Sequence, residues 1–194
     1  MNFLAHAYLS FENPDILVGN MIADLVKGKQ IEQYSVEIQH GIQIHRKIDS
    51  YTDSHPITQQ AMKIFRQSAG KYAGPFLDVA YDHFLAMDVL NEPNEGWKAF
   101  AEKCYMQISL YSDTLPPKFC SMFMYMKSED WLYSYRFDWM IERSFDRLKN
   151  RAAYLDNDAP VFNDFQQHYQ EIGESYKVFF PELKEYVLDI LEST

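Results

Sequence analysis

Hydrophobic residues recur along most of this chain at the three- and four-residue spacings that place them on one face of an α-helix. The most informative stretch is residues 38–56, IQHGIQIHRKIDSYTDSHP, which is closed by Pro56 because the residue before a proline is disfavoured in helical conformation. One face of this expected helix carries Ile38, Ile42, His45, Asp49 and Thr52. The face begins apolar and then presents an imidazole and a carboxylate, so it either meets solvent there or lines a polar site. Our working hypothesis is that it forms half of a metal site.

The same periodicity predicts helices over most of the remaining sequence. Asn13 and Pro14 form a start signal, with Asn as the N-cap and Pro at the first helical position. The last two helices are expected to be separated at Pro181. Besides the stretch above, the expected helices are residues 3–10, 14–28, 56–70, 75–90, 96–112, 116–128, 137–152, 158–180 and 182–192. A short segment at residues 131–136 leads into the helix at 137–152. No strand pattern with turn chemistry is present. The sequence therefore predicts one all-α, multi-helix domain over residues 1–194, with about eight to ten helices.

Composition agrees with this picture and restricts the choice of partners. Only 7 Gly and 8 Pro punctuate 194 residues, which favours long helices joined by short loops. The net charge of −10 argues against a nucleic-acid partner and against a membrane surface, because both require a basic face. An acidic protein partner remains compatible with this charge if it docks on a local basic patch. Oligomeric state is not predicted.

The cysteines and the N-terminal segment indicate a cytoplasmic protein. Cys104 and Cys120 lack metal-type spacing and are expected to be free thiols in a reducing compartment. The opening segment, MNFLAHAYLSFENP, has neither the basic region nor the long apolar run of a signal peptide. No apolar segment approaches the length of a membrane span.

Ionisable residues set inside apolar helices are the strongest chemical signal. An unpaired buried charge is costly, so such residues are paired, exposed or bound to a metal. They lie within the first 83 residues and comprise His6, Asp24, His45, Asp49, Asp82 and His83, with Asp78 nearby. The helix that carries Asp82 and His83 is too apolar for a solvated face. Facing helices of a bundle are known to assemble metal sites from such residues.

Each of these residues also has an ordinary structural interpretation. His6 alone is more often a satisfied core histidine than a ligand. Asp24 has Lys27 three residues later as an ion-pair partner. His45 and Asp49 are four residues apart and form a surface pair equally well. The basic residues late in the chain indicate a solvated face that could also bind an anion: Arg143, Arg147, Lys149 and Arg151.

The ligand types limit the chemistry of such a site. Carboxylate and imidazole ligands without thiolate suit Mn²⁺, Fe²⁺, Mg²⁺ or Zn²⁺. An ion held in this way polarises a phosphoryl oxygen and activates water, so phosphoester hydrolysis is the reaction that follows naturally.

Four segments in fixed order carry a family resemblance: MNFLAHAYLS, GNMIADLVKG, GIQIHRKIDSYTDSHP and LDVAYDHFLA. Together with SEDWLYSYR and the later FFP, they resemble the acyl carrier protein phosphodiesterase family over nearly the full chain. The resemblance implies an all-helical fold related to the HD-type metal-dependent phosphohydrolases. It implies removal of the 4′-phosphopantetheine arm from holo-acyl carrier protein, giving apo-carrier. It also implies a divalent metal, most typically Mn²⁺, with Mg²⁺ or Fe²⁺ as alternatives.

The resemblance also implies functional residues. The implied metal ligands are His6, Asp24, His45, Asp49, Asp82 and His83. Of these, Asp24, His45 and Asp82 are expected to be catalytic, with Asp24 first. The sequence departs from the family pattern at Gln43, where histidine is common, and at Met87-Asp88, where an Arg-His pair is common.

Because the implied partner is acidic, a local basic dock is expected. The expected substrate-binding residues are Lys27, Arg46 and Lys47. They lie within the segments GNMIADLVKG and GIQIHRKIDSYTDSHP that carry the resemblance. Two alternatives remain open. One is an HD-type phosphohydrolase of a nucleotide or other small phosphoester, and the other is a non-catalytic helical protein that binds a carrier.

Overall fold

A computed structural model describes residues 1–193, and no β-strand occurs in that range. The α-helices are α1 (Phe3–Tyr8), α2 (Pro14–Ile22), α3 (Val36–Ser54), α4 (Pro56–Ala69), α5 (Ala73–Met87), α6 (Gly96–Ser109), α7 (Pro117–Ser128), α8 (Trp131–Ser134), α9 (Asp138–Arg151), α10 (Val161–Gln167) and α11 (Tyr169–Glu192). Short 3₁₀ helices are η1 (Ala23–Leu25), η2 (Gly28–Gln33) and η3 (Gly70–Tyr72). The prediction of an all-α fold is confirmed, and the helices exceed the expected number because several are a few turns or less.

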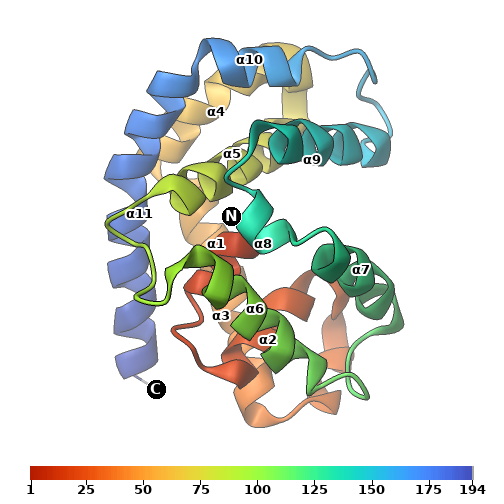
Figure 1. Cartoon of the computed structure of the whole chain (residues 1–194). Helices are drawn as coiled ribbons and strands as arrows, with labels where there is room; N and C mark the ends of the chain where they lie inside the picture. Colours follow the sequence, from red (N-terminus) through yellow and green to blue (C-terminus); the bar gives the residue numbers. More distant parts are fainter. Residues whose placement is uncertain (194) are drawn as a thin grey trace.

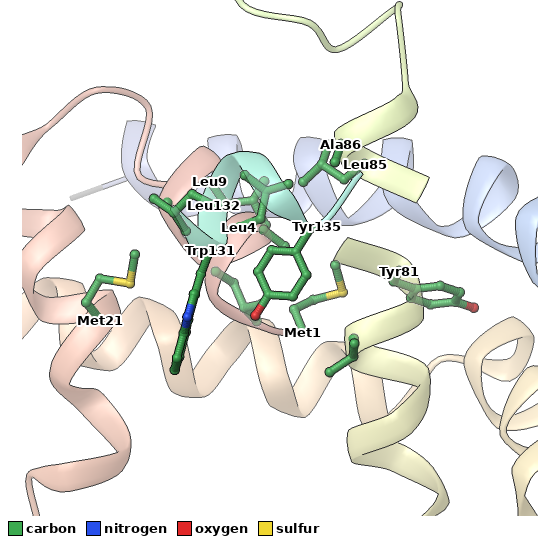
Figure 2. Close-up of a cluster of buried hydrophobic side chains, with 14 of the residues drawn as sticks. Met1, Leu4, Leu9, Met21, Tyr81, Leu85, Ala86, Trp131, Leu132 and Tyr135 are labelled. Atoms are coloured by element: carbon green, nitrogen blue, oxygen red, sulfur yellow. The ribbon is translucent and has the colours of Figure 1, made fainter. Parts of the chain in front are cut away.

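The short helices α1 and α8 lie at the centre of the molecule. In Figure 1, α4, α5, α9 and α10 gather at one end, and α2, α3, α6 and α7 gather at the other. Helix α11 runs along one side and spans both groups. Figure 2 shows how Trp131, Leu132 and Tyr135 pack with Leu4 of α1 and with Met1, all of which are buried. This packing fixes α1 between the two ends of the molecule.

Helices α2 and α3 approach each other closely at two glycines. A Cβ atom at Gly19 would lie 2.4 Å from the Ile38 carbonyl oxygen, and one at Gly41 would lie 2.7 Å from the Ile16 carbonyl oxygen. Because these neighbours are backbone atoms, any larger residue would push the helices apart. The contact brings the end of α2 and the segment after it beside the middle of α3.

Local signals set several helix boundaries as expected. The Asn13 side chain accepts hydrogen bonds from the backbone N–H groups of Asp15 and Ile16, with Pro14 at the first helical position, so the predicted start signal is confirmed. Helix α3 ends before Pro56, and α4 begins at that proline. The N-cap of α4 is His55, which makes no side-chain cap.

Two predicted boundaries are wrong. Pro181 lies inside α11, and the preceding break falls at His168. A proline removes one helical hydrogen bond, but the buried side chains of Phe179, Phe180 and Leu183 hold the helix against the core on both sides of it. The helix expected to run to Gly28 ends at Ile22 and tightens into η1, which carries Asp24.

None of the helices within residues 1–193 combines the length and apolarity needed to cross a membrane.

Candidate metal centre

Two histidines from different helices stack on each other in the core. His6 lies on α1 and His45 on α3, and the two side chains are buried. Their ring centroids are 3.9 Å apart and their planes differ by 16°. The packing of α1 against the core, rather than any local signal, brings His6 to this position.

The carboxylate of Asp49 lies against both imidazoles. Its Oδ1 is 3.2 Å from His6 Nε2, and its Oδ2 is 3.2 Å from His45 Nε2. One ligand atom from each of His6, His45 and Asp49 falls within 4.8 Å of the others. Since His45 and Asp49 are four residues apart on α3, the helical period places both on the face toward His6.

Asp24 joins this cluster from η1 and stands at its solvent edge. Its Oδ1 is 3.4 Å from His45 Nε2, and its side chain is 85% exposed. Among the described residues Lys27 makes no ion pair with it, so the partner of Asp24 is the histidine rather than the nearby lysine. The close approach of α2 and α3 at Gly19 and Gly41 makes this contact reachable.

The imidazole nitrogens of this cluster have no hydrogen-bond partner. Nδ1 and Nε2 of both His6 and His45 are buried and make no hydrogen bond among the described residues, although each Nε2 lies 3.2 Å from an oxygen of Asp49. Buried polar atoms are rarely left in this state. Two imidazoles and a carboxylate, aimed at one another without hydrogen bonds, are a donor set that fits a divalent ion such as Mn²⁺, Fe²⁺ or Zn²⁺.

The electrostatics of the cluster differ from one residue to the next. Burial, together with the neighbouring His45, lowers the pKa of His6 to about 4. Burial also opposes a charge on His45, but Asp24 and Asp49 outweigh it and raise the pKa of His45 to about 9. His45 lowers the pKa of Asp24. Burial would raise the pKa of Asp49, but the two imidazoles hold it far below its usual range. Without a metal, His45 is therefore the residue that carries a proton at neutral pH.

The amino group of Met1 also lies close to Asp49. It is 3.4 Å from Asp49 Oδ1 and 3.0 Å from Asp78 Oδ1. Burial disfavours its charge, but the two carboxylates raise its pKa to about 10. Asp78 therefore pairs with a cation and does not reach the histidines.

A cavity of about 130 Å³ opens onto the cluster. His6, His45 and Asp24 contribute polar atoms to its lining. Its apolar wall consists of Phe3, Met21, Leu25 and Met122. Arg151, at the end of α9, closes it on another side. The cavity therefore combines the candidate ligands with one basic residue from a distant part of the chain.

The structure does not bring Asp82 into this cluster. Its Oδ2 accepts a 2.7 Å hydrogen bond from the Leu4 N–H, and its Oδ1 accepts hydrogen bonds from Ala5 N–H at 3.2 Å and Asn2 N–H at 3.3 Å. Asp82 therefore caps the start of α1, whose own N-cap residue, Asn2, makes no side-chain cap. Burial raises the pKa of this carboxyl to about 7. Through α1, Asp82 fixes the position of His6.

His83 also lies apart from the cluster, and both of its nitrogens are satisfied. Nδ1 is 2.8 Å from the Tyr135 carbonyl oxygen, and Nε2 is 2.8 Å from the Tyr169 hydroxyl. Burial lowers its pKa. A ring with both nitrogens engaged has no lone pair to offer a metal.

The expected docking residues lie on the surface near the cluster. Lys27, Arg46 and Lys47 are all exposed. The Arg46 guanidinium donates a 3.1 Å hydrogen bond to the Val26 carbonyl oxygen, which ties α3 to the segment after Asp24. None of the three lines the cavity, where the basic residue is Arg151. A periodic basic stripe on α9 was its only signal in the sequence, and nothing local indicated that the stripe ends at the cavity.

The positions that depart from the family pattern lie elsewhere. Gln43 is exposed on α3. Met87 and Asp88 line a separate groove of about 620 Å³ between the segment after α5 and α11. None of the three lines the cavity at the histidines. The departures therefore leave the candidate ligand set intact.

Comparison with known proteins identifies the family of this chain. The family model for acyl carrier protein phosphodiesterase matches residues 1–183. Proteins named acyl carrier protein phosphodiesterase from Salmonella paratyphi A (strain ATCC 9150 / SARB42) and Salmonella agona (strain SL483) are each 33% identical over 184 residues, covering 94% of this chain and 95% of theirs. No solved structure matches the chain. This chain therefore belongs to the acyl carrier protein phosphodiesterase family.

Proposed function

We propose that this chain is a metal-dependent hydrolase that removes 4′-phosphopantetheine from holo-acyl carrier protein. Membership of the family supports the reaction and the substrate. The observation that carries the metal dependence is that the four imidazole nitrogens of His6 and His45 make no hydrogen bond although Asp49 lies beside both rings. Relatedness to HD-type phosphohydrolases stays a prediction from the sequence.

In this proposal His6, His45 and Asp49 hold the ion, and Asp24 completes the set or acts on water at its edge. Mn²⁺ is our first choice, with Mg²⁺ or Fe²⁺ as alternatives. A divalent ion held there supplies positive charge that stabilises the negative charge developing on the phosphate oxygens. We assign Asp82 and His83 supporting roles, because their polar atoms are occupied by α1 and by two tyrosines.

Asp24 is the residue best placed to act on the attacking water. Its lowered pKa keeps it ionised, and its exposed position lets water and substrate reach it. A carboxylate so placed accepts the proton of the water as its oxygen bonds to phosphorus. The bond between phosphorus and the carrier's serine oxygen breaks, and that oxygen takes up a proton. The products are apo-carrier and 4′-phosphopantetheine.

The exposed basic residues beside the cavity serve to dock the acidic carrier. Lys27 follows Asp24 by three residues, Arg46 and Lys47 follow His45 directly on α3, and all three are exposed. Since Arg46 also binds the Val26 carbonyl, Lys47→Glu is the cleaner test of charge. We expect a higher KM for carrier and a weaker dependence of KM on salt, with kcat unchanged. An unchanged KM would show that Lys47 does not contribute to carrier binding.

The decisive experiment is incubation of the purified chain with holo-acyl carrier protein and Mn²⁺, followed by mass spectrometry of the carrier. We expect the carrier to lose the mass of the phosphopantetheine arm, and we expect EDTA to stop the reaction. Hydrolysis of a generic phosphodiester without loss of the arm would favour a small-molecule phosphohydrolase. Failure to bind any divalent ion would favour a non-catalytic carrier-binding protein.

A further inference from the structure

Three arginines form a stripe along α9 that ends at the candidate metal centre. Arg143, Arg147 and Arg151 follow one another at four-residue spacing and so share one face of the helix. Arg151 lines the cavity that contains His6 and His45. It also lines an adjoining cavity of about 50 Å³, together with Arg147 and Trp131.

The first two arginines of the stripe share one carboxylate. Glu129 Oε1 lies 2.6 Å from Arg143 Nη2, and Glu129 Oε2 lies 2.6 Å from Arg147 Nη2. The Trp131 indole N–H also donates to Glu129, and the Arg147 guanidinium lies 4.3 Å from the centre of the Trp131 ring. Glu129 and Trp131 thus hold the side chains of Arg143 and Arg147 in place beside one carboxylate.

Arg151 has no such partner. No carboxylate of the described residues pairs with it, although Arg143, Arg147 and Lys149 on the same helix are each paired. Its charge therefore remains available at a cavity whose lining also includes the polar side chains of His6, His45, Asp24, Asn2 and Asn20. A guanidinium in that position suits an anion with two oxygens in one plane, because its planar fork donates two parallel hydrogen bonds.

We propose that Arg151 binds the phosphate group of the substrate and holds it against the His6–His45–Asp49 centre. This inference rests on the proposed function and adds a substrate-binding residue to it. The two cavities share Arg151 in their lining, so the two ester substituents of a bound phosphodiester can extend in two directions, one into each cavity. Arg151 stands where these cavities meet and so orients the phosphorus toward the water beside Asp24.

The test compares Arg151→Ala and Arg151→Lys with wild type, using the full chain. Inorganic phosphate is the probe, and its binding to the Mn²⁺-loaded protein is followed by phosphorus NMR relaxation. We expect Arg151→Ala to weaken phosphate binding about 10- to 100-fold, while Mn²⁺ affinity measured by electron paramagnetic resonance is unchanged. Arg151→Lys should recover part of the loss, because it restores the charge without the fork. In turnover with holo-acyl carrier protein, kcat/KM should fall in the same order.

Arg143→Ala is the matched control, because it removes an arginine of the same stripe that is paired with Glu129 and lies outside the cavity. We expect it to leave phosphate binding unchanged. Equal phosphate affinity in wild type and Arg151→Ala, with Mn²⁺ bound in both, would overturn the role of Arg151 alone. A wild-type chain that binds no Mn²⁺ would instead overturn the metal centre, and this proposal with it. The Mn²⁺ measurement therefore separates the two failures.

Discussion

The buried histidines of this chain fall into two environments that look alike in the sequence. His6 and His45 stack with ring centroids 3.9 Å apart, and none of their four ring nitrogens makes a hydrogen bond, although Asp49 lies beside them. His83 is buried to a similar degree, yet both of its nitrogens lie 2.8 Å from an oxygen partner. Burial alone therefore does not identify a ligand. The two environments differ in whether the ring nitrogens of the histidine already take part in hydrogen bonds.

Removal of the Asp49 charge is expected to have the largest effect on metal binding and activity. Asp49→Asn keeps the shape but removes a ligand charge and the partner of two imidazoles. We expect Mn²⁺ affinity and kcat/KM on holo-acyl carrier protein to fall by about 100-fold or more. Asp53→Asn, one turn further along α3 and exposed, is the control and should match wild type. An Asp49→Asn protein with normal Mn²⁺ affinity would place the metal elsewhere.

The two stacked histidines, His6 and His45, should also differ in how pH affects their binding to a metal. The pKa of about 9 at His45 means that this ring holds a proton at pH 7, and that proton must leave when its nitrogen binds an ion. The pKa of about 4 at His6 means that this ring is already neutral there. Rising pH removes the competing proton, so Mn²⁺ affinity should increase about tenfold per pH unit between pH 7 and 9.

Calorimetry of Mn²⁺ binding in buffers of different ionisation enthalpy measures this proton directly. We expect about one proton released per ion at pH 7 and progressively less toward pH 9. Binding at pH 7 without proton release would show that His45 is not a ligand or that its proton is not held by Asp24 and Asp49.

Local sequence signals were sufficient for much of the fold because they act within a few residues. The Asn13 cap and the Pro56 boundary depend on backbone chemistry at those positions, and both were predicted. Pro181 was mispredicted as a break because the packing of α11 on the core outweighs one lost hydrogen bond. That packing depends on residues far away in the chain, which a local pattern does not contain.

In the candidate site, too, local patterns place some residues and long-range packing places the others. His45 and Asp49 share a face by helical period alone, so the sequence brings them together. The partners that separate His83 from them, Tyr135 and Tyr169, are 52 and 86 residues distant in sequence. Arg151 reaches the cavity because α9 packs beside α5. Long-range packing, rather than residue type, decides which polar groups meet.

Asp82 offers a sharper test of residues that support the centre without joining it. Asp82→Asn replaces an oxygen that accepts backbone hydrogen bonds with a donor, so we expect the free energy of unfolding to fall by about 2–3 kcal/mol in urea titrations at pH 8. Because burial raises the pKa of Asp82 to about 7 in the folded protein, above its value in the unfolded chain, wild type gains stability as pH falls from 8 to 5. Asp82→Asn lacks this titration, so the difference between the two proteins should grow at pH 5. Mn²⁺ affinity should fall only modestly, through displacement of His6. A loss as large as that of Asp49→Asn, without loss of stability, would return Asp82 to the ligand set.

His83→Phe is expected to have the smallest effect, and it tests the opening comparison directly. Phenylalanine keeps the ring in the aromatic packing around Phe165 but leaves the Tyr135 carbonyl oxygen without its hydrogen bond. Tyr169 is 39% exposed, so water can replace its lost partner. We therefore expect the free energy of unfolding to fall by about 1–2 kcal/mol, with Mn²⁺ affinity and kcat/KM per folded molecule unchanged. If His83→Phe instead abolished Mn²⁺ binding in a protein as stable as wild type, a histidine with both nitrogens satisfied would be a ligand after all, and the criterion that separates the two environments would fail.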